Sequence, residues 1–367
     1  MTGFSTKTDA AALEWAINDG VMRLREWGTD TIRMLPQSDT YEWALINELT
    51  IGAAEVCALQ FDDPTGRISR LHARLVRDKT RWRLRDLGSK NGIRLDGACH
   101  PEILLEPGVE IGIGGLTLIA ESRCLIKLRG FLARLLGWRA DRAAVIDHAL
   151  RSIRMAVTRR AALVLRGDGG LVPIACAIHR RVLGADRPFI VCDPRRRQGK
   201  ATIRSAENYE TGMPAFAAAT GGSLCVRSSR LPRDFNSVIT AFRGSNSQVQ
   251  LVVCARMRED YDRYLAAPIT VPPLASRPDE LDRIITEYAE DALAELGAPR
   301  TGFLSADHEL VRTHAASSLP DIEKATLRLV AIRESRNLSI AAARLGMAHV
   351  SLSRWIGRRK LPMHVMA

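Results

Sequence analysis

The hydrophobic pattern of this chain changes twice along its length, so no single fold accounts for all of it. Residues 20–122 contain short alternating runs broken by Gly, Asp and Pro, a pattern typical of a β-sandwich or barrel. Residues 161–273 alternate compact apolar runs with helical stretches, which indicates an α/β domain with a mainly parallel sheet. Helical patterns follow as far as the C-terminus. At 367 residues the chain has room for two or three domains.

The predicted fold class is therefore multidomain, with an all-β sandwich, then an α/β domain, then an all-α C-terminal part. The other predicted divisions are an N-terminal segment at 1–19, linker helices at 123–160, a helical lid at 274–320 and a helical module at 321–367.

Composition restricts the compartment and the partners. The chain has 53 Lys and Arg against 41 Asp and Glu, and the formal charge of +12 predicts an anionic partner. Its apolar runs are shorter than the ~20 residues of a membrane span, and its start does not match a secretory signal. The seven cysteines include no CxxC pair and indicate reduced thiols. We therefore expect a cytoplasmic protein with no membrane segment.

Two motifs in the β-rich part place small donors and cations close together in sequence. SRLH at 69–72 is followed by DLGSKNG at 86–92. The side chains suited to an oxyanion are Ser69, Arg70, Ser89, Lys90 and Asn91. Residues 67–94 hold ten basic and two acidic residues, which favours a phosphate site. Composition alone favours a solvated basic face of a sandwich, because charge runs usually lie on such faces.

SRLHA, DLGSKNG and the later EPGVEIGIG resemble, in order and spacing, the signature of the forkhead-associated (FHA) domain. Such domains are β-sandwiches whose loops at one end bind phosphothreonine peptides. The resemblance implies that Ser69 and Arg70 contact the phosphate and that Asn91 holds the peptide backbone. It also implies that Ser89 and Lys90 shape or charge the same loop. The implied partner is a phosphorylated protein or a Ser/Thr kinase.

The resemblance gives His72 a packing role beside the binding loop and no catalytic role. It also identifies one departure, because Ala53 stands where the family usually has an arginine on the phosphate. Two interpretations follow: Arg67, Arg70 or Lys90 replaces the missing cation, or the domain docks its partner without phosphate.

The α/β part begins with ALVLRGDGGLVPIACAIHRR, in the order strand, glycine-rich loop, helix. A working phosphate loop needs a Lys for the phosphates and a Ser or Thr for Mg²⁺, and neither follows this loop. Pro173 also removes a backbone N–H near the helix start. We expect a poor nucleotide site. His179 lies in a helical apolar pattern, which favours packing over catalysis.

AIHRRVLGADRPFIVCDP, AAATGGSLCVRSSRLP and VPPLASRPDEL resemble, in that order, the AAA+ domain of bacterial sigma-54-dependent transcription activators. Arg227 and Ser228 occupy the positions of that family's two acidic residues, and its GAFTGA loop has no counterpart between Asp193 and Gly221. The resemblance thus implies a scaffold that does not hydrolyse ATP, with no catalytic residues, metal site or cofactor. Nucleotide binding without hydrolysis and a working ATPase are the alternatives.

Residues 321–367 carry nine basic and three acidic residues in three helical segments. The apolar positions predicted to form one small core are Leu327, Val330, Ala331, Ile340, Ala343, Leu345, Leu352 and Trp355. Gly346 lies where a helix ends in a tight turn before the last helix.

This C-terminal pattern resembles the Fis-type helix-turn-helix of the same activators, with Ala342, Ala343, Leu345 and Gly346 matching directly. The resemblance implies a last helix in the major groove of double-stranded DNA, bound by a homodimer or higher homo-oligomer. The implied base-edge contacts are His349, Ser351 and Ser353, and the implied phosphate contacts are Arg354, Arg358, Arg359 and Lys360. A basic helical module that docks a protein is the alternative.

Taken together, these patterns predict a DNA-binding transcription regulator that senses a phosphorylated partner and is not an enzyme. Two other hypotheses remain open. One is an active ATP-hydrolysing sigma-54-dependent activator, and the other is a phosphopeptide adaptor that does not bind DNA.

Overall fold

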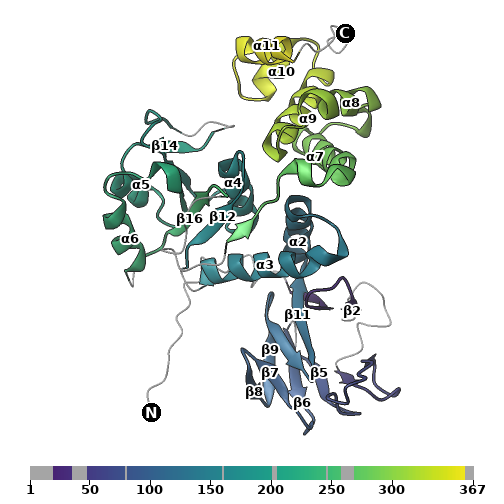
Figure 1. The fold of residues 1–367 in the computed structure, drawn as a ribbon. Coiled ribbons are helices and arrows are strands. Elements are labelled where there is room, and N and C mark those ends of the chain that lie inside the picture. Colours follow the sequence, from purple (N-terminus) through teal and green to yellow (C-terminus); the bar gives the residue numbers. More distant parts are fainter. Residues whose placement is uncertain are drawn as a thin grey trace. The chain divides into compact units, whose positions relative to one another are not determined.

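The computed structural model of the protein describes residues 20–34, 48–78, 81–158, 161–200, 205–244, 247–257 and 268–359. The chain divides into two compact units (Figure 1). Unit 1 comprises Met1–Arg159 with Arg181–Gly184, and unit 2 comprises Arg160–Arg180 with Ala185–Ala367.

Unit 1 contains the predicted β-sandwich. One sheet has the order β2 (Ile32–Met34), β1 (Val21–Glu26), β11 (Leu116–Ser122), β10 (Glu110–Ile113), β7 (Ile93–Leu95) and β8 (Ala98–His100). The other has the order β4 (Leu59–Gln60), β3 (Glu48–Gly52), β5 (Ala73–Asp78), β6 (Arg81–Asp86) and β9 (Glu102–Leu105). All of these neighbours pair antiparallel except β3 and β4, which pair parallel.

The sandwich core follows from the two-residue period of its strands. In β6, Trp82 and Leu84 are buried between the sheets, whereas Arg83 and Arg85 lie on the outer face. Leu75 of β5 and Ile111 of β10 join the same fully buried cluster. The basic residues of this part therefore alternate with the core residues instead of disrupting the core.

Two helices continue directly from the sandwich and belong to the same unit. The helix α2 (Arg123–Leu136) begins after β11, where the Ser122 side chain accepts a hydrogen bond from Leu125 N and caps the helix. After the short 3₁₀ turn η2 (Ala140–Arg142) comes α3 (Ala143–Thr158). The segment predicted as linker helices is thus packed on the sandwich within one compact unit.

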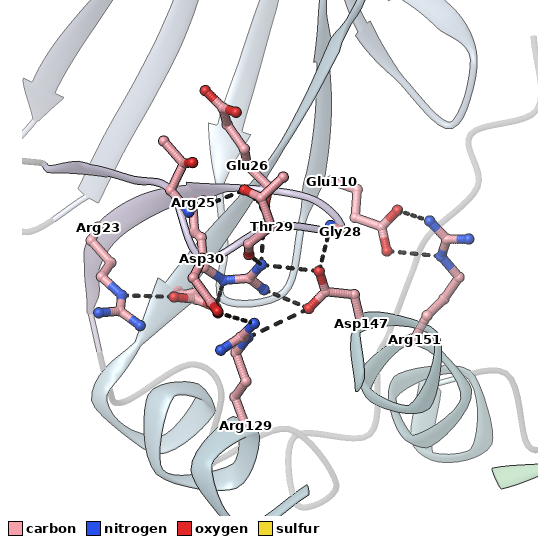
Figure 2. Close-up of polar contacts among 12 residues, drawn as sticks. Arg23, Arg25, Glu26, Gly28, Thr29, Asp30, Glu110, Arg129, Asp147 and Arg151 are labelled. Atoms are coloured by element: carbon pink, nitrogen blue, oxygen red, sulfur yellow. Dashed lines mark hydrogen bonds and ion pairs between the residues drawn. The ribbon is translucent and has the colours of Figure 1, made fainter. Parts of the chain in front are cut away.

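A buried ion cluster joins these helices to the sandwich. Arg25 on β1 donates from Nε to Glu121 Oε1 at 2.7 Å and from Nη2 to Asp147 Oδ1 of α3 at 2.6 Å. All three side chains are almost completely buried. Figure 2 shows the Arg25 guanidinium between the sheet and α3, with Arg129 of α2 beside Asp147.

Unit 2 begins with a wholly parallel sheet, as the alternating pattern predicted. Its order is β14 (Glu207–Tyr209), β13 (Phe189–Cys192), β15 (Ser223–Arg227), β16 (Gln250–Ala255), β12 (Leu163–Arg166) and β17 (Ile269–Thr270). The helices α5 (Gly212–Ala218) and α6 (Phe235–Arg243) pack on one face through a shared apolar cluster. The helix α4 (Leu171–Val182) meets the other face, where His179 contacts Ser223.

Five helices follow among the described residues of the same unit. They are α7 (Leu281–Leu296), α8 (Ser305–His314), α9 (Leu319–Arg333), α10 (Leu338–Arg344) and α11 (His349–Arg358). Short 3₁₀ turns occur at η3 (Ser228–Arg230), η5 (Leu274–Ser276), η6 (Pro278–Glu280) and η7 (Arg300–Gly302). The helix α9 contacts α7, α8 and α10, so the division predicted between 320 and 321 falls in the first turn of a shared helix.

The core of the last three helices agrees with the prediction at six positions and differs at two. Leu327, Val330, Ala331, Leu345, Leu352 and Trp355 are buried. Ile340 is 44% exposed and Ala343 is exposed as well, so their predicted burial is wrong. The seven-residue helix α10 turns Ala341 and Ala342 inward instead, which leaves its neighbours on the outer side. Among the described residues, no helix has the length and hydrophobicity needed to cross a bilayer.

Candidate functional site

Three loops meet at one end of the sandwich, and Ser69 connects them. Its backbone carbonyl accepts a hydrogen bond from Ala53 N after β3 at 3.1 Å. Its hydroxyl oxygen accepts another from Lys90 N at 3.0 Å, in the loop between β6 and β7. The predicted residues Ser69, Arg70, Ser89, Lys90 and Asn91 are therefore brought to one end of unit 1.

His72 is a structural bridge beside this site, as the resemblance implied. Its ring is completely buried. Nδ1 accepts a hydrogen bond from Ser69 N at 3.1 Å, and Nε2 lies 3.2 Å from Gly92 O. This pattern fits the tautomer with the proton on Nε2, which donates to the Gly92 carbonyl. Its two ring nitrogens thus hold two loops at a fixed separation.

Gly52 allows the Arg70 backbone to lie directly against β3. A Cβ atom at position 52 would stand 2.1 Å from Arg70 O, a distance no side chain tolerates. The same carbonyl accepts hydrogen bonds from Ala54 N at 3.1 Å and Cys57 Sγ at 3.2 Å. The Arg70 backbone is therefore fixed, while its side chain is exposed.

The loop after β6 is organised by Asp86 and Ser89. Asp86 accepts hydrogen bonds from Gly88 N at 2.9 Å and from the Ser89 hydroxyl at 2.6 Å. The Ser89 oxygen in turn accepts from Gly92 N at 3.0 Å, so Ser89 shapes the loop from within. Asn91 Nδ2 donates to Arg67 O at 2.7 Å and ties this loop to the one before β5.

Asp63 organises the loop before β5. It accepts hydrogen bonds from the Thr65 backbone and hydroxyl and from Ile68 N. The Thr65 hydroxyl bond is the main cause that lowers the pKa of Asp63 from its ordinary 3.8. Sequence analysis did not single out Asp63 or Asp86, although an Asp two or three residues before a Thr or Ser is the signal of such a turn.

The loop cations differ from the strand cations of the same basic run. Arg67, Arg70 and Lys90 are exposed, and none of them forms an ion pair with another described residue. The strand arginines Arg74, Arg83 and Arg85 are instead paired with Glu48 or Glu102. This end of the sandwich thus presents unneutralised cations on hydrogen-bonded loops, an arrangement that can bind an oxyanion.

In unit 2, the glycine-rich loop after β12 lies beside the start of α9. A Cβ at Gly169 would stand 3.9 Å from Ser318 Cβ, and one at Gly170 would stand 3.5 Å from Pro320 Cγ. Arg227 ends β15 and is half-buried, where the resemblance expected an acidic pair. Within the described ranges no group of three or more metal-ligating side chains occurs.

His179 and Cys192 are buried groups of unit 2. The His179 ring is buried, with Nδ1 2.7 Å from Ser223 Oγ and Nε2 3.0 Å from Arg187 O. Burial lowers the pKa of His179. Burial likewise raises the pKa of Cys192 to about 12, which keeps this thiol protonated near neutral pH.

The helix α11 presents most of its predicted residues on one exposed side. His349, Ser351, Ser353, Arg354 and Arg358 are all exposed. The opposite side, with Leu352, Trp355 and Ile356, is buried. Val350 was missed by sequence analysis, although it is 54% exposed beside the polar residues.

Arg359 differs from the other predicted DNA contacts. Its Nη2 donates to Asp321 Oδ1 of α9 at 2.6 Å, and its guanidinium lies over the Trp355 ring. Only 21% of this side chain is exposed. Lys360 lies outside the described residues.

Comparison with known proteins identifies part of unit 1. The model of the FHA domain family matches residues 49–114, so this part of the chain is an FHA domain, a module class that binds phosphothreonine peptides. No curated protein sequence matches the chain.

Solved structures also resemble about a quarter to a third of the chain. One, described as part of an analysis of phosphothreonine-dependent FHA domain interactions, is 22% identical with a TM-score of 0.23, and the match covers 28% of this chain and 95% of that one. The FHA domain of CT664 from Chlamydia trachomatis is 20% identical with a TM-score of 0.22, covering 26% and 92%. EmbR from Mycobacterium tuberculosis, in complex with a low-affinity phosphopeptide, is 20% identical with a TM-score of 0.26, covering 32% and 30%.

Proposed function

We propose that this protein is a DNA-binding transcription regulator whose FHA domain reads a phosphothreonine on a partner protein. The observation that carries the proposal is the set of unneutralised cations on the hydrogen-bonded loops that Ser69 connects. Arg70 follows Ser69 in the chain, and the Lys90 backbone N–H donates to the Ser69 hydroxyl oxygen. A phosphate between them gains charge-assisted hydrogen bonds and requires little loop reordering.

Arg67 and Lys90 supply the charge that Ala53 does not. Both are exposed in the two loops that Asn91 ties together through its bond to Arg67 O. The phosphate therefore meets cations from two loops, although the position after Gly52 carries none. This supports phosphate-dependent binding over docking that ignores the phosphate.

A peptide-binding measurement tests this part. The full chain is titrated with a threonine-containing peptide library in phosphorylated and unphosphorylated form. We expect binding of the phosphorylated library only, with a loss of about ten- to a hundredfold in Arg70→Ala. Arg81→Ala is the matched control, because Arg81 is exposed at the opposite end of β6 and should not affect binding. Equal binding of both peptide forms would refute phosphate recognition.

The α/β part of unit 2 is proposed to be an AAA+-like scaffold without ATPase activity. The strand β14 lies at one edge of the sheet, next to β13. When the other five strands, β12, β13, β15, β16 and β17, are numbered one to five in chain order, their order in the sheet is 5-1-4-3-2, which supports the AAA+ resemblance. The loop after β12 has no Lys and lies beside Ser318 and Pro320. Arg227 places a cation where Mg²⁺ would need carboxylates. ATP turnover by the purified chain above the buffer rate would overturn this part.

The C-terminal helices α9 to α11 are proposed to be a Fis-type helix-turn-helix that acts in a homodimer. The exposed side of α11 supports this, because its polar and basic residues face solvent while Leu352 and Trp355 hold the helix on its core. Base edges meet His349, Ser351 and Ser353, and phosphates meet Arg354 and Arg358. Arg359 joins them only if its ion pair with Asp321 opens.

Point variants test DNA binding better than a deletion does. The helix α9 also packs on α7 and α8, so removing residues from 321 onward would disturb those helices as well. Arg354→Gln with Arg358→Gln should weaken duplex binding and lower its salt slope by roughly 0.9 for each lost phosphate contact. Unchanged binding in this double variant would favour the adaptor hypothesis.

A further inference from the structure

The carboxyl edge of the parallel sheet in unit 2 carries arginines after four strands. Arg166 ends β12, Arg227 ends β15 and Arg256 follows β16. After β13 come three consecutive arginines, in the segment 194–200 that we call the arginine loop. Loops at the carboxyl ends of parallel strands form the edge at which such sheets bind ligands. The three consecutive arginines of the arginine loop indicate an anionic ligand.

Buried polar groups hold the backbone of the arginine loop. Asn208 is 3% exposed, and its Nδ2 donates to the carbonyls of Asp193, Arg196 and Arg197 at 3.4, 3.0 and 3.3 Å. The Asp193 carboxylate is fully buried and accepts a hydrogen bond from Arg195 N at 3.1 Å. The backbones of Gly199 and Asn208 exchange two further bonds, at 3.1 and 2.9 Å.

The basic side chains of this loop are exposed, and the Glu210 carboxylate accepts a hydrogen bond from Gln198 N of the same loop at 3.2 Å. Arg195, Arg196, Arg197 and Lys200 form no ion pair with another described residue. The buried Asp193 is paired with Arg230 instead. Four like charges repel one another, and solubility alone does not require their backbone to be fixed. A row of cations on a backbone fixed by hydrogen bonds fits a partner that presents a row of closely spaced anions.

We propose that the arginine loop binds the phosphate backbone of duplex DNA independently of base sequence. It would be a second DNA contact, in addition to that of α11. This rests on the proposed DNA-binding function. Duplex DNA carries one negative charge for about every 1.7 Å of its axis, and adjacent arginines neutralise such a row by releasing condensed counterions. The inference gives the α/β scaffold a function that needs no nucleotide.

The salt dependence of binding tests the proposal. The full chain is titrated with a random-sequence duplex of about 30 base pairs between 50 and 300 mM salt. Arg195→Gln with Arg197→Gln should lower the salt slope by about 1.8 and weaken binding roughly thirtyfold at 0.15 M salt. The matched control is Arg180→Gln with Arg243→Gln, two exposed arginines near the C-terminal ends of α4 and α6, at the opposite edge of the sheet. The control should keep the wild-type slope.

Failure of the inference is distinguishable from failure of the proposed function. If the loop variant keeps the wild-type slope while the Arg354 and Arg358 variant loses affinity, the inference is wrong and the function stands. If the wild type binds no duplex, both are wrong. A loop variant that keeps duplex binding but loses binding to a poly(U) RNA or to a multiply phosphorylated peptide would also overturn the inference.

Discussion

Two arginines in unit 1, Arg25 on a strand and Arg70 in a loop, have opposite environments. Arg25 alternates with apolar residues on β1 and is completely buried, bonded to both Glu121 and Asp147. Arg70 lies in the loop before β5. Its side chain is exposed and has no acidic partner in the described chain. The difference lies in whether a carboxylate from a distant segment reaches the guanidinium.

The comparison separates cations that hold the unit together from cations that are available to a ligand. Burial opposes the charge of Arg25, but the bonds and charges of Asp147 and Glu121 outweigh it, so the pKa of Arg25 is raised. Removing one carboxylate there leaves the buried guanidinium of Arg25 with a single acidic partner and fewer hydrogen bonds. Removing an exposed loop arginine leaves nothing unpaired. The two groups should therefore respond differently to the same kind of substitution.

The largest effect is expected at the buried cluster. Asp147→Ala deprives Arg25 of two hydrogen bonds and should cost about 3–5 kcal/mol of unfolding free energy in unit 1. Hydrogen exchange of the β1 and α3 amides in the full chain measures this loss. A loss below about 1 kcal/mol would show that the cluster contributes little to the stability of the unit.

The next largest effect is expected at the exposed loop arginine Arg70, on ligand binding and not on stability. Arg70→Ala should leave the unfolding free energy of unit 1 within about 0.5 kcal/mol of wild type, because the side chain is exposed. The same variant should lose most of its phosphopeptide affinity. Parallel denaturation and titration experiments check both statements, and a large stability loss would place Arg70 with the structural arginines.

A gain of function should follow from restoring the missing cation. Ala53→Arg adds a guanidinium beside the backbone that bonds Ser69 O. We expect roughly tenfold tighter binding of a phosphothreonine peptide and no change for its unphosphorylated form. Ala53→Gln, which has similar length and no charge, is the control. Equal affinities of the two variants would mean that the phosphate does not reach this position.

A smaller effect is expected at the partly exposed ion pair of Arg151 and Glu110, which lies beside the buried cluster in Figure 2. Glu110→Gln should cost at most about 1 kcal/mol, because solvent already screens this pair. Hydrogen exchange of the same amides makes the result directly comparable with Asp147→Ala. Similar losses in both variants would contradict the distinction between buried and exposed pairs.

The smallest effect is expected on lowering the pH, at the loop that Asp63 organises. The pKa of Asp63 is lowered in the folded loop, mainly by the Thr65 hydroxyl. Its stabilisation of the loop is therefore complete above its ordinary value of 3.8 and is lost as the pH falls through the lower folded value. Chemical-shift titration of the Thr65 and Ile68 amides should show this transition, and Asp63→Asn should remove it.

Much of the fold could be predicted from the sequence, because the period of buried positions is local information. Alternation in β5 and β6 predicted the sandwich, and apolar runs between helices predicted the parallel sheet. At α10 the same reasoning was wrong for Ile340 and Ala343. Over seven residues, several helical faces fit the apolar pattern almost equally well, and packing on neighbouring helices selects one.

The candidate site was predictable in its motifs but not in its connections. SRLH and DLGSKNG identified the loops that now meet through Ser69 and Asn91. The pairing of Arg359 with Asp321 was not predictable, because 38 residues separate them and nothing local marks the contact. The hydrogen bonds that hold the arginine loop were not predictable for the same reason. Asn208, which donates to Arg196 O, lies 12 residues further along the chain.

The sequence by itself determined the order of the folds, the position of the FHA loops and the amount of positive charge. Only the tertiary structure decided which arginines are neutralised, as Arg25 is by Asp147, and which remain available, as Arg70 does. Periodicity is encoded in neighbouring residues, whereas an ion pair depends on two segments brought together by folding. Whether an arginine stabilises the fold or is available to a ligand therefore depends on its burial and its partners, and composition gives neither.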